Sequence, residues 1–157
     1  MSTLIKNGTL VNEGVSIQGT ITIGDDGRIA SIGTEAPLAE DHYDHVIDAA
    51  GCYVLPGVID EHVHFREPGM TDKATIRSES RAAAYGGVTS YMEMPNTVPT
   101  TTTEAAWEDK RQRGRKDSAV NYAFYLGATN NNAETLRQAD WQHTPAIKLF
   151  MLSLIHI

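Results

Sequence analysis

Apolar residues alternate with polar ones along the first third of the chain. The alternation runs through both sides of an Asp-Gly turn at 25–27, and its apolar positions are Val15, Ile17, Ile21, Ile23, Ile29 and Ile32. A two-residue period around such a turn predicts a β-hairpin with one buried face. Short apolar stretches at 4–5 and 9–11 predict further strands. We therefore expect a small β domain over residues 1–52.

From residue 53 onward the pattern changes to strands that alternate with helices. Strands are predicted at 53–59, 88–94, 120–126 and 146–151, and helices at 75–85, 102–113 and 133–139. This alternation is typical of a parallel sheet whose faces are covered by helices. A complete (β/α)8 barrel takes about 250 residues, whereas the chain has 157. The sequence therefore fits either a small open sheet or one part of a larger domain.

Charge and composition exclude several classes of protein. The chain has 13 Lys and Arg against 20 Asp and Glu, for a net charge of -7, and the acidic surface disfavours binding to nucleic acid or anionic lipid. The first residues lack the apolar segment of a signal peptide, and no apolar run approaches the roughly 18 residues of a membrane span. The single cysteine, Cys52, cannot form an internal disulfide or hold zinc alone. We expect a cytoplasmic protein whose metal site, if present, uses other ligands.

His62 and His64 are the first candidates for metal ligands. They stand two residues apart at the end of an apolar strand, so both imidazoles point to the same side of that strand. A tight turn at Pro68-Gly69 follows directly. A His-x-His pair by itself is more often ordinary surface polarity, but the apolar strand in front and the turn behind favour a metal site.

The residues around this pair resemble a known family. Residues 56–69 resemble the metal-binding signature of the amidohydrolase superfamily, and residues 62–69, His-Val-His-Phe-Arg-Glu-Pro-Gly, resemble its dihydroorotase version. Residues 81–90 and 94–99 are similar to the helix and strand that follow in dihydroorotases. The resemblance extends over about residues 1–151 and is most specific between 56 and 99.

This resemblance implies a fold and an activity. The fold is α/β, the N-terminal part of a TIM-type (β/α)8 metal-dependent hydrolase barrel preceded by a small β-sandwich segment. Residues 1–52 would form the β-sandwich segment, and residues 53–151 the first four βα units of an incomplete barrel. The activity is the zinc-dependent, reversible hydrolysis of the cyclic amide of dihydroorotate to carbamoyl aspartate in pyrimidine biosynthesis.

Arg66 and Asn96 are the residues that the resemblance assigns, with His64, to substrate binding. A guanidinium presents a planar pair of donors that matches a carboxylate, and an asparagine amide adds another N–H. Dihydroorotate carries a ring carboxylate at a place where hydantoins and dihydropyrimidines have none. Allantoinases resemble this segment but usually have another residue in place of Arg66. The alternatives are a surface salt bridge for Arg66 and an Asx turn for Asn96.

Lys148 is the third metal ligand that the resemblance implies, beside His62 and His64. It lies in an apolar stretch where a buried ammonium would be costly. In the resembling family a lysine in this strand reacts as the free amine with CO₂, and the carbamate bridges two zinc ions. The alternative is a lysine whose ammonium reaches solvent from a strand end.

Other polar residues give weaker indications. Asp60 is able to orient a ligating histidine, or simply to bond backbone. Glu93 lies between two methionines on a predicted strand, and it needs a partner if it is buried, although the sequence identifies none. Three further histidines lie in polar segments and are expected to be in solvent, namely His42, His45 and His143.

The last six residues, 152–157, depart from the family pattern. They coincide with one translation of a transposon end used in sequencing libraries, so we expect a non-native tail and exclude His156 from the metal site. The other histidine ligands and the catalytic aspartate of the family come from later strands. We therefore expect no general acid or base within this chain, and an inactive fragment.

Two other functions stay open. An allantoinase or hydantoinase-type cyclic amidohydrolase would use the same chemistry, and a catalytically silent dihydroorotase-like assembly subunit would use none. Silent subunits tend to lose metal ligands, so the presence of His62, His64 and Lys148 disfavours the second alternative. The expected partner is a small-molecule substrate, with a homo-oligomer possible for the full-length protein.

Overall fold

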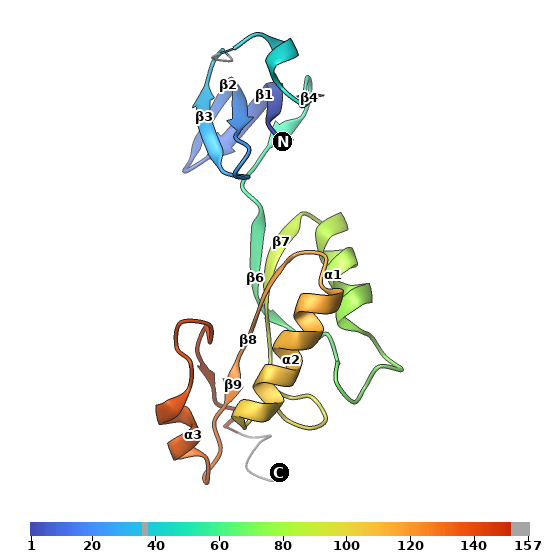
Figure 1. Ribbon diagram of the computed structural model, residues 1–157, viewed down its shortest axis with the longest axis vertical. Coiled ribbons are helices and arrows are strands. Elements are labelled where there is room, and N and C mark those ends of the chain that lie inside the picture. The colour runs from blue at the N-terminus through green and yellow to red at the C-terminus, as the bar shows by residue number, and fades with distance from the viewer. Residues whose placement is uncertain (36–37, 152–157) are drawn as a thin grey trace. The chain divides into compact units, whose positions relative to one another are not determined.

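The chain divides into two compact units, Met1–Pro56 and Gly57–Ile157. The computed structural model describes residues 1–35 and 38–151 (Figure 1). The tail expected at 152–157, with His156, lies outside the described residues. The division comes slightly later than the boundary expected after residue 52, because Tyr53 and Val54 still pair with the first strand of the N-terminal unit.

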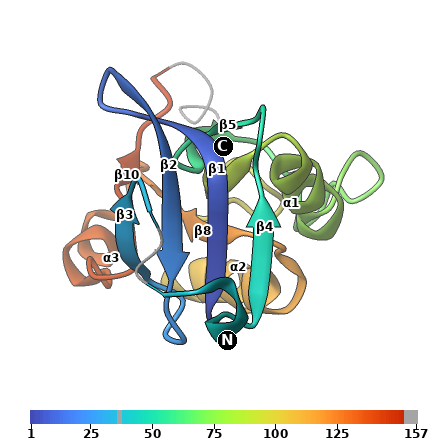
Figure 2. The same cartoon turned by 90° about the horizontal axis from the view of Figure 1, so that it is seen from above.

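The N-terminal unit is a five-stranded sheet with one short 3-10 helix. Its elements are β1 (Thr3–Asn12), β2 (Val15–Ile23), β3 (Ile29–Gly33), the 3-10 helix Glu40–His42, β4 (His45–Asp48) and β5 (Tyr53–Val54). The strand order is β3-β2-β1-β4, and β5 also pairs with β1 (Figure 2). The antiparallel pairing of β2 with β3 confirms the predicted hairpin, but the apolar face that was expected to be buried is largely exposed.

Strand β1 is longer than the sequence indicates. Two short strands were expected around Leu4 and Leu10, and the structure joins them into one strand with an irregularity in its pairing between Ile5 and Gly8. Such an irregularity bends a strand and increases its twist. It lets one strand pair in parallel with β4 through its first half and with β5 through its second half.

One face of this sheet is apolar and exposed. Leu10 pairs with Ile17, and Ile21 pairs with Ile32, so these side chains share a face. Ile17 is 43% exposed and Ile32 is 57% exposed. Together with neighbouring apolar residues they line an open groove. A continuous apolar surface of this kind favours association.

We therefore expect the 157-residue chain, expressed alone, to self-associate. Light scattering after size exclusion should give a mass that rises with protein concentration. Replacing Ile17 and Ile32 together by Thr should lower that mass, because the change keeps the β-branched shape and removes apolar surface. Ser16→Thr, on the exposed neighbouring position, is the matched control. A monomer at every concentration would contradict the prediction.

The C-terminal unit alternates strands and helices as predicted. Its elements are β6 (Val58–Val63), α1 (Ile76–Tyr85), β7 (Val88–Glu93), α2 (Glu104–Asp117), β8 (Asn121–Phe124), β9 (Leu126–Gly127), α3 (Ala133–Gln138) and β10 (Ile147–Lys148). Strands β6, β7 and β8 form a parallel sheet, and β9 and β10 form a separate parallel pair. The last strand is shorter than the predicted 146–151, because only Ile147 and Lys148 find strand partners.

Threonine caps fix where the two longer helices begin. The Thr75 side chain accepts a hydrogen bond from the Ser78 backbone N–H and forms a capping box with that residue. Thr103 accepts from the Ala106 N–H in the same way. Helix α1 ends at Tyr85, Gly86 is its C-cap, and Gly87 follows with a φ of +84°. The predicted helices are thus confirmed, although α2 continues to Asp117.

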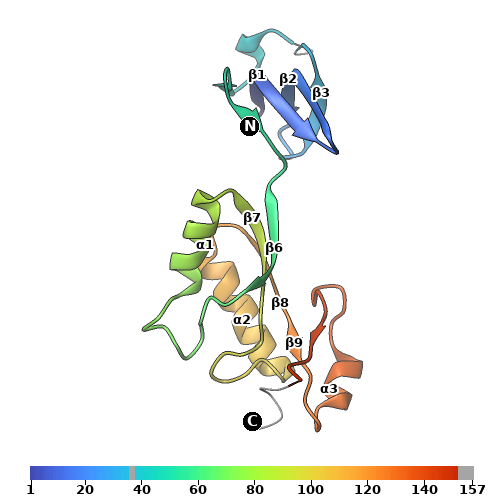
Figure 3. The ribbon, with the colours of Figure 1, turned by 180° about the vertical axis from the view of Figure 1, so that it is seen from behind.

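Helices α1 and α2 lie against the same face of the β6-β7-β8 sheet (Figures 1 and 3). The core between them consists of Phe65, Ile76, Tyr91, Trp107, Phe124 and Leu126. Val63 also packs against this core, and it pairs in register with Glu93. Because side chains alternate along a strand, the burial of Val63 and Phe65 leaves His62 and His64 on the opposite side. Packing of the helix side thus sets the direction of both imidazoles.

Candidate functional site

His62 and His64 lie side by side at the carboxyl end of β6. Their ring centroids are 5.4 Å apart, with His62 exposed and His64 half-buried. The Nδ1 atom of His64 is 2.9 Å from Oδ1 of Asn96, which follows β7. With its proton on Nδ1, the ring donates to Asn96 and keeps the Nε2 lone pair for another ligand. The structure thus brings together three of the residues predicted from the sequence.

The surroundings of His64 favour its neutral form. Burial lowers the pKa of the His64 imidazole, and electrostatic repulsion from Arg66, His62 and Lys148 lowers this pKa further, while the hydrogen bond to Asn96 acts in the opposite direction. A neutral imidazole is the form that binds a metal ion.

Arg66 occupies an unusual backbone conformation in the turn after β6. Its φ is +68°, in the left-handed region that L-residues other than Gly, Asn and Asp seldom adopt. Within the described residues its half-buried guanidinium forms no ion pair with a carboxylate. The surface salt bridge considered for Arg66 is therefore not formed by this part of the chain, and the positive charge is available to an anion.

Asn96 keeps one part of its amide for a second contact. Its Oδ1 faces His64, and no acceptor for its Nδ2 lies within hydrogen-bond distance among residues 1–35 and 38–151. The Asn96 amide oxygen therefore accepts from the His64 ring, and its Nδ2 group can donate a hydrogen bond to a ligand. An Asx turn, the alternative from the sequence, is not among the hydrogen bonds of this side chain in the described residues.

Lys148 lies at the end of the short strand β10 and is half-buried. Its Nζ is 5.1 Å from the ring centroid of Phe150, within the range of a cation–π contact. The sequence suggested a lysine in the middle of a buried strand, but the strand has two residues and the side chain is partly open to solvent.

The turn that carries Arg66 is anchored by the next residues of the motif. Oε2 of Glu67 accepts from the Ile76 backbone N–H at the start of α1, at 2.9 Å, and Oε1 accepts from Arg113 of α2, at 3.2 Å. Gly69 has a φ of +88°, and a Cβ at this position would be 2.0 Å from the carbonyl oxygen of Val98. Glu67 and Gly69 therefore fix the turn against two helices and against the loop that carries Asn96.

Glu93 has a partner that the sequence analysis missed. Lys110 of α2 places Nζ 2.8 Å from Oε2 of Glu93, and both side chains are almost completely buried. Burial raises the pKa of the Glu93 carboxyl and lowers the pKa of the Lys110 ammonium, while their mutual attraction opposes both shifts. A sequence signal existed, because Lys110 shares the buried face of α2 with Trp107 and Gly114 at helical spacing.

The remaining candidates have ordinary roles. Oδ1 of Asp60 accepts from the His62 backbone N–H at 3.0 Å, so the carboxylate bonds backbone. His42 and His45 are exposed, as expected. His143 is exposed as well and lies 2.6 Å from Asp140.

The described residues do not contain a complete set of metal ligands. No group of three His, Cys, Asp or Glu side chains that could hold a metal ion occurs within them. In the same part of the chain no helix combines the length and the apolar character that crossing a membrane requires.

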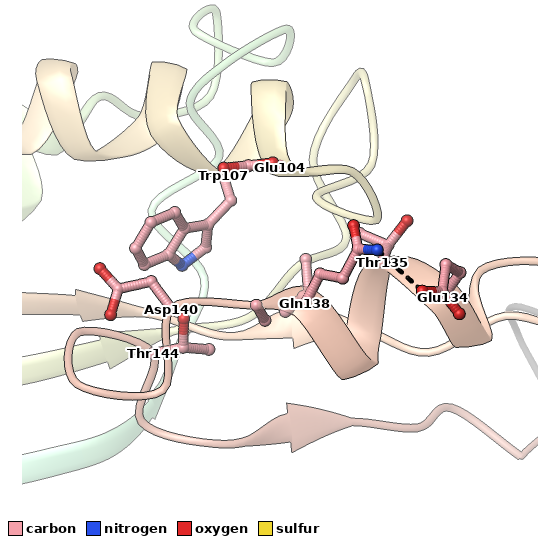
Figure 4. A pocket seen from close by; sticks show the side chains of 9 residues that line it. Glu104, Trp107, Glu134, Thr135, Gln138, Asp140 and Thr144 are labelled. Carbon is pink, nitrogen blue, oxygen red and sulfur yellow. Dashed lines mark hydrogen bonds between the residues drawn. The ribbon is translucent and has the colours of Figure 1, made fainter.

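A cavity of about 170 Å³ lies elsewhere, beside Trp107 and α3 (Figure 4). Three carboxylates belong to its lining, those of Glu104, Glu134 and Asp140, and none of the residues around His64 does. Carboxylates would repel an anionic ring. This cavity is therefore not a second site for the carboxylate ligand that Arg66 suits.

Known proteins resemble the chain over most of its length. Dihydroorotases from Methanosarcina mazei and Lactobacillus helveticus are 42% and 37% identical to it over 81% and 98% of the chain. An allantoinase from Solibacter usitatus is 37% identical over 85% of the chain. The aligned parts make up 27%, 34% and 28% of these relatives, so the chain spans about a third of their length or less.

Solved structures show the same architecture. An L-hydantoinase from Arthrobacter aurescens superposes with a TM-score of 0.85 at 31% identity, over 92% of the chain and 32% of that structure. A dihydropyrimidinase from Brevibacillus agri gives 0.81 at 26% identity, over 98% and 34%. The sequence model of the Dihydro-orotase-like family matches residues 51–149, which include the histidine pair, Arg66, Asn96 and Lys148. The chain therefore belongs to the dihydroorotase-like family of cyclic amide hydrolases in the amidohydrolase superfamily.

Proposed function

We propose that this chain is the N-terminal part of a dihydroorotase, which reversibly hydrolyses dihydroorotate to carbamoyl aspartate. The proposal is supported mainly by two donors near His64, the Arg66 guanidinium and the Nδ2 group of Asn96, which find no protein acceptor among residues 1–35 and 38–151. Two such donors suit a carboxylate, and dihydroorotate has one on its ring. The proposal includes a TIM-type barrel of which residues 53–151 form the first four βα units, next to the β domain of residues 1–52.

The residues around His64 fit a zinc site in which further ligands come from outside this chain. His62 and His64 would hold metal through imidazole nitrogens, and a carbamate on Lys148 would supply oxygens shared by two zinc ions. Bound zinc would polarise the ring carbonyl and make water a stronger nucleophile. The neutral form of His64, favoured by its surroundings, supports this assignment.

The chain's own residues hold the substrate in place. Arg66 would take the carboxylate in a two-pronged contact, and Asn96 would add an N–H while its oxygen keeps His64 oriented. Holding the ring at this end turns its amide carbonyl toward the histidines. We assign the proton transfer to an aspartate outside this chain. Roles in pyrimidine biosynthesis, in the cytoplasm and as a homo-oligomer belong to the same proposal.

An allantoinase or a hydantoinase is the second candidate function. The similarity to the Solibacter usitatus allantoinase and to the hydantoinase structures favours it. Arg66 separates the two candidates, because a cyclic amide without a ring carboxylate gives this guanidinium nothing to bind. A catalytically silent subunit has less support, since His62 and His64 lie side by side and Asn96 still meets His64.

The test uses the full-length protein, by which we mean residues 1–151 continued by the remaining segment that the relatives possess. Its kcat/KM is measured on dihydroorotate, allantoin and hydantoin, with zinc content determined in the same preparation. We expect dihydroorotate to give the highest value. A higher value for allantoin or hydantoin would replace the proposal by the second candidate, and no turnover of any of them would favour the silent subunit.

Asn96→Asp separates the two contacts assigned to this side chain. The aspartate still accepts from His64, so zinc content should stay near that of the parent, but it loses the N–H donor and repels the ring carboxylate. We expect KM for dihydroorotate to rise about tenfold or more, as for loss of a hydrogen bond to a charged group. Asn130→Asp, at an exposed site, is the control. An unchanged KM would contradict the substrate contact.

A further inference from the structure

A buried ion pair lies beneath the turn that carries Arg66. Glu93 is 1% exposed and Lys110 is 0% exposed, and their side chains meet on the helix side of the sheet. The face that bears His62 and His64 is on the other side. The pair therefore takes no direct part in binding a ligand beside His64.

Each member of the pair also holds backbone at a strand end. Oε1 of Glu93 accepts from the Phe65 backbone N–H at 3.1 Å, next to Arg66. Nζ of Lys110 donates to the carbonyl oxygen of Met94 at 3.1 Å, two residues before Asn96. The pair thus connects the turn after β6 with the loop after β7, and these two segments carry the donors assigned to the substrate carboxylate.

Stability alone does not explain such a pair. Moving two charges out of water costs more free energy than their attraction provides, unless additional hydrogen bonds stabilise both groups. Proteins in which such a pair is replaced by apolar residues are often equally stable. Here the completing contacts go to Phe65 and Met94, and the Arg66 backbone N–H also favours the charged form of Glu93. Arg66 needs such support, because its left-handed backbone is unfavourable by itself.

We propose that Glu93 and Lys110 are positioning residues for substrate selection, which hold the Arg66 turn and the Asn96 loop at the spacing that a ring carboxylate requires. The carboxylate part of this inference rests on the proposed function. The pair acts through the backbone at Phe65 and Met94. Loss of the Glu93 acceptor should let Arg66 leave its left-handed conformation and swing its guanidinium away from the ligand.

Two double variants of the full-length protein test the inference, and both remove the charges together so that none is left unpaired. Glu93→Gln with Lys110→Met keeps an acceptor oxygen for the Phe65 N–H, whereas Glu93→Leu with Lys110→Met removes it. Each is measured for KM and kcat on dihydroorotate and hydantoin, for thermal stability, and for amide hydrogen exchange at Phe65 and Arg66. Glu93→Asp is the third variant. It keeps the charge, but its side chain is one methylene shorter, so the carboxylate lies farther from the Phe65 N–H.

We expect the leucine variant to raise KM for dihydroorotate by about tenfold, with little change for hydantoin and with faster exchange at Phe65 and Arg66. The glutamine variant should recover the part of the dihydroorotate affinity that depends on the Phe65 contact, and keep the smaller loss that comes from the missing Lys110 contact to Met94. The same KM for dihydroorotate in the parent and in a folded leucine variant would overturn the inference. The inference would also be overturned if kcat/KM fell equally for dihydroorotate and hydantoin, in proportion to the loss of thermal stability.

The remaining outcomes are also decisive. If the double variants do not fold, Glu93→Asp takes their place, and parental KM and exchange in that variant would overturn the inference. If the parent does not turn over dihydroorotate, the proposed function fails. The exchange rates at Phe65 and Arg66 then still show whether Glu93 holds this turn, because they do not depend on activity.

Discussion

Lys148→Ala in the full-length protein should lose both zinc and activity. The change removes the amine that would become the bridging carbamate, and the two histidines that remain in this chain cannot replace its oxygens. Mutation of a residue that only hydrogen-bonds to a metal ligand lowers metal affinity or activity by about 10- to 100-fold. Removal of a ligand itself should therefore lower kcat/KM by more than about 100-fold. Metal analysis after dialysis and steady-state assays measure the two effects.

Two comparisons make the Lys148 result specific. Lys116→Ala, at an exposed position of α2, should leave zinc content and kcat/KM unchanged. A short carboxylic acid added to the Lys148→Ala variant should restore part of the zinc and activity, because it supplies the missing oxygens. Full zinc content and activity in the untreated variant would show that Lys148 is not a ligand.

Arg66→Lys should have the second-largest effect, and only on a substrate with a ring carboxylate. An ammonium keeps the charge but cannot make the planar two-pronged contact of a guanidinium. The expected loss of about 1.5 to 3 kcal/mol corresponds to a fall of about 10- to 150-fold in kcat/KM for dihydroorotate. Steady-state kinetics in both directions measure it, since carbamoyl aspartate also carries the carboxylate.

The substrate itself provides the sharpest control for Arg66. Turnover of hydantoin, which lacks the carboxylate, should change little in Arg66→Lys. Arg77→Lys on the exposed side of α1 should leave both reactions unchanged. Equal losses on dihydroorotate and hydantoin would mean that Arg66 supports the fold of the turn, and unchanged kinetics would remove it from the site.

Local sequence signals predicted the helices and most strands. Thr75 and Thr103 precede helices that their side chains cap, and the glycines after Tyr85 end the first of them. The period of two around the Asp-Gly turn predicted the hairpin of β2 and β3. These features depend on residues close in sequence, and for that reason a pattern along the chain is enough to find them.

The sequence was less informative where distant residues decide the outcome. The length of β10 depends on how many residues β9 offers, and the continuity of β1 depends on two different parallel partners. For the site, the His-x-His spacing placed both imidazoles on one side. Nothing in the local pattern showed that Asn96 would meet His64, or that Lys110 would reach Glu93 across the core.

The resemblance to dihydroorotases assigned roles to residues whose function could not be inferred from sequence spacing alone. A lone arginine is ordinarily a surface charge, and only the family pattern assigned Arg66 to a carboxylate. The structure adds that its guanidinium has no carboxylate partner among the described residues, and that its charge acts on His64. The two kinds of argument therefore support the same assignment from different directions.

Anomalous diffraction at the zinc edge, from crystals of the full-length protein with dihydroorotate bound, would locate both the metal ions and the ring carboxylate. We expect zinc peaks beside His62, His64 and a carbamylated Lys148, with the ring carboxylate in contact with Arg66 and Asn96. Zinc bound away from these histidines, or a ring carboxylate that points away from Arg66, would contradict this expectation.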